Sequence, residues 1–175
     1  MNTKTSRGLA AAGLLATALV GIAGSGSAAH ADTPQWQRER GIVLECTGDA
    51  HGVQVYASLY ENQRYGNTLQ VVLGDPDGGN GASKETDQKF VVDSVVKASV
   101  KVNGKRVLIE GVAERHGPRT KVYDEHEDAG YLIKTRGYHR QIVTDMGARY
   151  AGKSVPLACD TAFFYDLEVK KIPIV

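Results

Sequence analysis

A short acidic run around one histidine is the first stretch of this sequence that could do chemistry. Residues 124–128 read Asp-Glu-His-Glu-Asp. Side chains alternate along an extended chain, so Asp124, His126 and Asp128 would share one side. Carboxylates and imidazole together suit a divalent cation. We therefore consider a divalent-cation site here. No other cofactor is expected. The alternative is a charged, exposed turn between two strands.

A glycine-rich segment, Gly74–Asp87, is a second candidate for binding a cation. Calcium takes six to eight oxygen ligands and is often bound in flexible loops. The spacing differs from that of an EF-hand, because no glutamate closes the twelfth position and no helical pattern flanks the segment. A solvated turn is the alternative, and the sequence leaves calcium binding open. The oxygen donors are Asp75, Asp77, Asn80 and Asp87.

Eight tyrosines, against three phenylalanines and one tryptophan, provide a further candidate site. Tyr56 and Tyr60 alternate with Val55 and Leu59, and Tyr65 follows in the next loop. If the aliphatic side faces the core, the rings lie on the opposite surface. Tyrosine offers a large contact area and a hydroxyl group at low entropic cost. The pattern predicts either a binding surface formed by Tyr56, Tyr60 and Tyr65, or rings that merely cover the sheet.

The chain contains two cysteines, Cys46 and Cys159, so one intramolecular pairing exists. In an oxidising compartment we expect a disulfide. It would close a loop of about 110 residues, worth about 4–5 kcal/mol in the chain-entropy model. Two buried thiols or half of a metal site are the alternatives, although no CxxC spacing supports zinc.

Alternation of apolar and polar residues is the pattern that would position these groups. The sequence Asn103-Gly104 between two alternating runs predicts a two-residue hairpin. We expect turns or loops at residues 74–83, 116–119, 124–128 and 147–153, and a turn of helix at 83–93. Strands are predicted at residues 42–46, 53–60, 69–73, 90–102, 105–109, 121–123, 131–135, 140–144, 155–159 and 163–169.

Many short strands with frequent turns predict an all-β fold. A single antiparallel β-sandwich and a small β-barrel both fit the pattern. In the last run, Phe163, Tyr165, Leu167 and Val169 fall on one side of the strand. No repeat of 20–50 residues and no linker to a second domain is visible.

The N-terminus has the three parts of a secretory signal peptide. Lys4 and Arg7 precede an apolar run, and small residues at Ala29 and Ala31 would permit cleavage after Ala31. The run is too short and too rich in alanine and glycine for a membrane span. We therefore expect a signal peptide at 1–31, a flexible N-terminal arm at 32–40 and a β-rich domain at 41–175. The protein is expected to be secreted and extracellular.

Removal of the signal peptide changes the net charge. It takes away two of the 21 basic residues and none of the 20 acidic ones, so the charge falls from +1 to −1. Scattered charges in a near-neutral domain argue against nucleic acid or an anionic membrane as the main partner.

Two resemblances accompany these patterns. The Ala- and Gly-rich signal peptide resembles those of secreted proteins from high-GC Gram-positive bacteria. Leu44-Glu-Cys46, Val53-Gln-Val55 and Met146-Gly-Ala-Arg-Tyr150 are similar to segments of the inhibitors of c-type lysozyme, which are small disulfide-bonded β-barrels. This chain has Met146 in place of their serine and lacks their following Trp-x-x-Lys, so no inhibitory residue is assigned.

These observations favour a non-catalytic, disulfide-stabilised β-domain that binds an extracellular protein or glycan. No GxSxG or HExxH motif is present. Two alternatives stay open: an inhibitor of a secreted hydrolase such as lysozyme, and a small metal-dependent secreted hydrolase that uses the acidic run.

Overall fold

The computed structural model describes residues 34–75 and 79–174. The expected signal peptide lies outside them, as does Asp77 of the glycine-rich segment. The chain divides into two units, Met1–Asp32 and Thr33–Val175, and the fold described here is that of the second.

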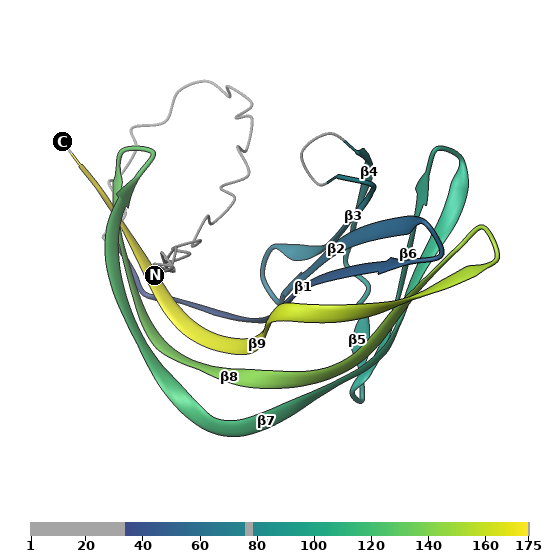
Figure 1. The fold of residues 1–175 in the computed structure, drawn as a ribbon. Helices are drawn as coiled ribbons and strands as arrows, with labels where there is room; N and C mark the ends of the chain where they lie inside the picture. The colour runs from purple at the N-terminus through teal and green to yellow at the C-terminus, as the bar shows by residue number, and fades with distance from the viewer. Residues whose placement is uncertain (1–33, 76–78, 175) are drawn as a thin grey trace, which may run out of the picture. The chain divides into compact units, whose positions relative to one another are not determined.

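The described residues form nine strands and no helix (Figure 1). Neighbouring strands are antiparallel and belong to one sheet, in the order β4-β3-β2-β1-β9-β8-β7-β6-β5. The edge strands β4 and β5 do not pair with each other, so the sheet is open. The all-β antiparallel prediction is confirmed. The strands are β1 (Gln37–Ala50), β2 (Val53–Asn62), β3 (Gly66–Leu73), β4 (Asn80–Thr86), β5 (Val91–Val92), β6 (Val95–Val102), β7 (Lys105–Asp128), β8 (Tyr131–Tyr150) and β9 (Lys153–Pro173).

The hydrophobic core lies where the sheet folds over itself. Strands β3 and β4 contact β6, with which they share no hydrogen-bonded ladder. Aliphatic side chains from both layers fill the space between them, as in a sandwich. The largest fully buried aliphatic side chains are Leu44, Val55, Leu69, Val71, Val96, Val102, Val107, Ile109 and Val155.

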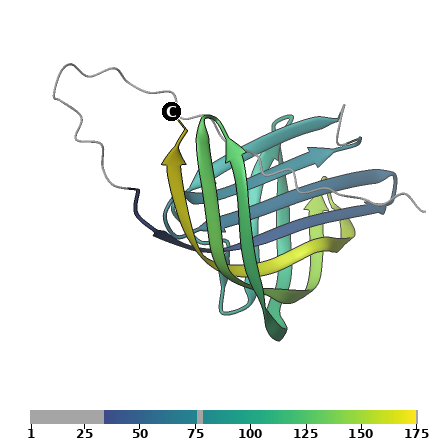
Figure 2. The same ribbon diagram turned by 90° about the vertical axis from the view of Figure 1, so that its left-hand side faces the viewer.

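Strands β7, β8 and β9 run far beyond this core. They contain 24, 20 and 21 residues, whereas about five or six are usual. One half of each strand contributes to the core. The other halves continue as a curved sheet together with the start of β1 (Figures 1 and 2). We call this part the extension; it comprises residues 37–41, 115–128, 131–141 and 161–173.

Two bulges separate the core half of the sheet from the extension. In β9, Cys159 pairs with Cys46 while Thr161 pairs with Glu45, so one extra residue is inserted. In β7, Arg115 and Arg119 are four residues apart, but their partners in β8, Ile142 and Arg140, are only two residues apart. An inserted residue changes which alternate side chains face the core.

Five of the described hairpins have left-handed backbone at both turn residues, as type I′ turns require. The predicted hairpin at Asn103-Gly104 is confirmed, with φ of 49° and 75°. The other four are His51-Gly52, Asp93-Ser94, Ala129-Gly130 and Ala151-Gly152. The last of these replaces the long loop expected at 147–153, because β8 and β9 continue almost to the turn.

Several other local expectations were wrong. Residues 116–119 are a bulge within β7, and the acidic run 124–128 continues that strand instead of breaking it. The expected helical turn at 83–93 begins as β4 and contains no helix. The flexible arm expected at 32–40 does not extend to residue 40, because β1 begins at Gln37.

The predicted disulfide is present and joins Cys46 of β1 to Cys159 of β9, 113 residues apart. It lies beside the β9 bulge, at the boundary between core half and extension. A disulfide is consistent with an oxidising, extracellular location. None of the described residues belongs to a helix that could cross a membrane.

On the side of the sheet opposite the core, the outer face, Tyr165 ties the extension to β2. Its hydroxyl accepts a hydrogen bond from Asn62 Nδ2 at 2.9 Å and donates one to the Glu61 carbonyl at 3.1 Å. Its ring stacks on Tyr60, and burial raises the Tyr165 pKa far above its usual range. The Tyr165 side chain packs against Gly41. A Cβ added at residue 41 would lie 2.4 Å from the Tyr165 hydroxyl oxygen and 1.7 Å from the Glu61 carbonyl oxygen.

Candidate functional site

The side of the extension that continues the core surface carries the candidate site, and we call it the inner face. Buried Leu44 pairs with Ala162, so alternate residues of β9 beyond Ala162 lie on the same side of the sheet. Their partners on β1, β8 and β7 share that side. The inner face comprises Arg38, Arg40, Arg115, Arg119, Lys121, Tyr123, Glu125, Glu127, Leu132, Lys134, Arg136, Tyr138, Arg140, Phe164, Asp166, Glu168, Lys170 and Ile172.

This surface is strongly basic. Nine of its side chains are Arg or Lys and four are Asp or Glu, a formal charge of +5. The chain from residue 32 onward has a net charge of −1. The sequence suggests that the charges are scattered. In the fold they are segregated, and positive charge is concentrated on the inner face.

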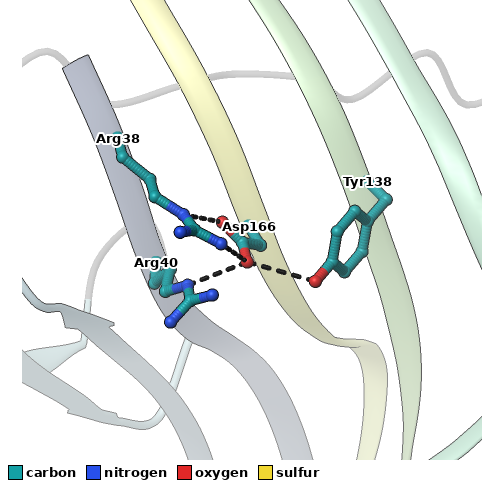
Figure 3. A network of polar contacts seen from close by, with 4 residues as sticks. All are labelled: Arg38, Arg40, Tyr138 and Asp166. Carbon is teal, nitrogen blue, oxygen red and sulfur yellow. Dashed lines mark hydrogen bonds and ion pairs between the residues drawn. The ribbon is translucent and has the colours of Figure 1, made fainter.

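A buried carboxylate, Asp166, organises the centre of the inner face (Figure 3). Arg38 donates from Nε and Nη2 to the two carboxylate oxygens, both at 2.7 Å. Arg40 Nε and the Tyr138 hydroxyl donate to Oδ2 at 2.8 and 3.1 Å. Asp166 is 5% exposed, whereas the Arg38 side chain is 59% exposed. The carboxylate therefore lies beneath guanidinium groups that stay open to solvent.

These contacts set the protonation state of Asp166. The bidentate hydrogen bond from Arg38, helped by Arg40 and Tyr138, lowers the Asp166 pKa to about 2 against the opposing effect of burial. The same pairing raises the Arg38 pKa. A carboxylate with so low a pKa is ionised near neutrality and cannot act there as a general acid. Its role is to hold two arginines in place.

Aromatic rings and carbonyls hold the other arginines of the inner face. The Arg115 guanidinium lies 3.8 Å from the ring centre of Phe164, and that of Arg119 lies 4.4 Å from the ring centre of Tyr138. Arg140 Nε donates to the carbonyl of Gly117 at 2.9 Å. Such stacking restricts a guanidinium while leaving its charge available.

The outer part of the inner face contains ion pairs as well. Arg136 pairs with Glu168 at 2.7 Å and stacks 4.1 Å from the ring centre of Trp36. Lys134 pairs with Glu125 at 2.9 Å, and this contact raises the Lys134 pKa. Exposed pairs of this kind contribute little to stability, because solvent and salt screen them. They moderate the positive charge in the distal part of the face.

The three tyrosines singled out from the sequence differ in their surroundings. Tyr56 and Tyr60 lie half-buried on the outer face, as the alternation predicts. Tyr60 is engaged within the fold, because its ring stacks on Tyr165 and its hydroxyl accepts a hydrogen bond from Asn62 at 2.7 Å. Tyr65 is 55% exposed and lies near Arg64. Tyr56 borders an open hollow of about 170 Å³ beside Gly48.

The acidic run does not assemble a metal site. Asp124 and His126 lie on the outer face of β7, and their side chains contact each other at 2.7 Å. Asp128 lies on the same side but about 13 Å along the strand from Asp124, given about 3.3 Å per residue. Among residues 34–75 and 79–174, no group of three His, Cys, Asp or Glu side chains is placed to hold a metal ion.

A phosphate-binding pattern in the sequence has the wrong structural context. Residues 147–154 read Gly-Ala-Arg-Tyr-Ala-Gly-Lys-Ser and match GxxxxGK[ST]. A P-loop connects a strand to a helix, whose N-terminus contributes to phosphate binding. Here the segment is the β8–β9 hairpin, so it provides no phosphate cradle. The match Ser94-Val-Val-Lys97 likewise spans a turn and the start of β6.

Sequence alternation did not reveal the inner face, because its charged residues come from four strands far apart in the chain.

No protein-family model matches the chain, and no curated protein matches it. A solved structure from Nitrosomonas europaea, described as an AttH, aligns with 82% of this chain at 10% identity and a TM-score of 0.33. This chain spans 52% of that one. A likeness this weak supports no conclusion about fold or function.

Proposed function

We propose that this protein is an exported, non-catalytic β-domain that binds an extracellular protein or glycan through the inner face of the extension. The observation that supports this proposal is the array of exposed arginines held in place by Asp166, Phe164, Tyr138 and Trp36. Preorganised side chains lose less entropy when a ligand binds.

The position of this array supports binding over a purely structural role. The fully buried core residues belong to the core half of the sheet, and from the extension Ala162 and Phe164 pack against them as partly buried side chains. Inner-face side chains apart from Asp166 stay at least partly exposed. A surface of ordered charged groups outside the core is suited to contacts with a partner.

The chemistry of the inner face also favours binding over catalysis. Its one buried carboxylate, Asp166, is ionised near neutrality and committed to two arginines. Acid–base catalysis uses groups whose pKa lies near the working pH. The Asp124–His126 pair lies on the opposite face and is exposed, so it does not join the arginines in one site.

Retention of extracellular ligands tests the proposal. The secreted form would be immobilised and exposed to culture-medium proteins and to an array of extracellular glycans. We expect retention that falls in the inner-face variant Arg38→Glu/Arg136→Glu. The matched variant Lys97→Glu/Lys171→Glu makes the same charge change at exposed positions off the inner face, and it should bind like the wild type. Equal retention by all three proteins, or no retained ligand, would contradict the proposal.

A further inference from the structure

We infer that Arg115, Arg119 and Arg140 form a binding site for the carboxylate groups of an acidic polysaccharide. The site lies on the inner face at the β7 bulge. This inference rests on the proposed function and specifies its ligand class.

The register of the sheet places like charges against each other at this point. Arg119 of β7 pairs directly with Arg140 of β8, and Arg115 pairs with the next inner-face residue of β8, Ile142. Like charges directly opposite on neighbouring strands destabilise a sheet. The fold therefore accepts an unfavourable arrangement that a bound anion would relieve.

No carboxylate of the described residues forms an ion pair with these three arginines. The buried carboxylate of the face, Asp166, is occupied by Arg38, Arg40 and Tyr138. The exposed carboxylates Glu125 and Glu168 pair with cations farther out on the extension. Positive charge at the bulge thus has no carboxylate partner within the described part of the chain.

The bulge itself brings the arginines together. Four residue steps in β7 oppose two steps in β8, so Arg115 and Arg119 both flank Arg140. Phe164, Tyr138 and the Gly117 carbonyl each restrain one guanidinium. An arginine fork matches the two oxygens of a carboxylate and binds it through paired hydrogen bonds.

The composition of the surrounding face favours an acidic polysaccharide over a protein. Protein interfaces are enriched in arginine but depleted in lysine and acidic residues, whereas this face adds three lysines and four carboxylates to its arginines. Aromatic rings lie among the cations, and Tyr123 is 77% exposed, so ring faces and hydroxyls are available to sugars. Lys121, two residues beyond Arg119 on the same face of β7, is exposed and would meet the next acidic group of a polysaccharide chain.

Calorimetric titration with polygalacturonate, at low and at moderate salt, tests the assignment. We expect binding by the wild type and at least tenfold weaker binding by Arg119→Gln/Arg140→Gln. The control Lys97→Gln/Lys171→Gln removes the same charge from outside the inner face and should bind like the wild type. Dextran, a neutral polysaccharide, should not bind. Polygalacturonate should also raise the melting temperature of the wild type, because it binds the folded state.

Loss of folding does not account for the expected result. Replacing both of the opposed arginines, Arg119 and Arg140, removes their mutual repulsion, so the double variant should melt no lower than the wild type. Equal binding of single-stranded DNA and polygalacturonate would overturn the polysaccharide assignment in favour of a general polyanion surface. Absence of polygalacturonate binding, or equal binding by both double variants, would overturn the site. The proposed function would survive that outcome if the wild type retained another extracellular ligand through Arg38 and Arg136.

Discussion

The two halves of β7 share one backbone ladder but differ in what their side chains do. Before the bulge, Val107, Ile109 and Ala113 are at most 5% exposed. After it, inner-face residues such as Lys121 are exposed, and Tyr123 is 77% exposed. Hydrogen bonds of a ladder contribute only modestly to net stability, whereas apolar burial is the main favourable contribution. The core half therefore stabilises the domain, and the extension is a surface supported by it.

Of two neighbouring residues of β9, Tyr165 attaches that surface to the core half, and Asp166 joins strands of the extension to one another on the opposite side of the sheet. Tyr165 is held on the outer face by Asn62 and the Glu61 carbonyl. Asp166 is held on the inner face by Arg38 and Arg40. Both are 5% exposed. The comparison predicts large losses of stability from changes in the core half and smaller losses from changes in the extension.

The largest effect is expected from removing the disulfide at the boundary. Cys46→Ala/Cys159→Ala should lower the free energy of unfolding by about 4–5 kcal/mol, because the unfolded chain loses a long crosslink. Urea unfolding of the oxidised wild type and the variant measures the difference. A loss below about 1 kcal/mol would mean that the crosslink does not restrict the unfolded chain as the chain-entropy model assumes.

The core and the extension can be compared directly with one type of substitution. Leu44→Ala removes a fully buried side chain and should cost about 2–5 kcal/mol. Leu132→Ala removes the same atoms from a partly exposed position of the extension, so we expect a loss below about 1 kcal/mol. Chemical denaturation measures both, and equal losses would contradict the proposed division of the sheet.

The junction on the outer face should be sensitive to added volume. Gly41→Ala places a methyl group against the Glu61 carbonyl and the Tyr165 ring, so we expect a loss of about 1–3 kcal/mol. At Gly147 a Cβ would lie 3.5 Å from its nearest neighbour, the Val155 carbonyl. Gly147→Ala is therefore the matched control, and thermal unfolding should show it close to the wild type. A tolerated Gly41→Ala would argue against a tight junction.

The sequence predicted the hairpin at Asn103-Gly104 but not those at Ala129-Gly130 and Ala151-Gly152. All three have positive φ at both turn residues. Asparagine adopts this conformation readily and thereby marks a turn, whereas alanine does not. Because the sequence does not mark these turns, the strands that they join were predicted to be too short. Pro118, expected in a turn, lies in the β7 bulge, where a residue can leave the ladder.

The inner face could not be predicted, because alternation gives two sides of a strand without saying which one faces the core. The sequence correctly grouped Phe163, Tyr165 and Leu167 on one side. The residue inserted in β9 after Cys159 turns that side outward and places Asp166 on the core side. A bulge of this kind depends on pairing between distant strands, for which the local sequence carries no signal.

The smallest effect concerns Asp166, whose contribution should depend on pH. Its pKa in the folded protein, about 2, is lower than the ordinary value of 3.8. A carboxyl group whose pKa is lowered by folding stabilises the protein above the ordinary pKa, and that stability is lost as the pH falls towards the folded value. Asp166→Asn should therefore be about 1–2 kcal/mol less stable than the wild type at pH 6, allowing for screening of the exposed arginines.

Urea unfolding between pH 6 and pH 2 measures this dependence. The difference between wild type and Asp166→Asn should be constant down to about pH 4 and shrink towards pH 2. Glu168→Gln, which breaks an exposed pair with Arg136, serves as the control and should change stability by less than about 1 kcal/mol. Parallel curves for wild type and Asp166→Asn would show that the arginines do not depend on this carboxylate.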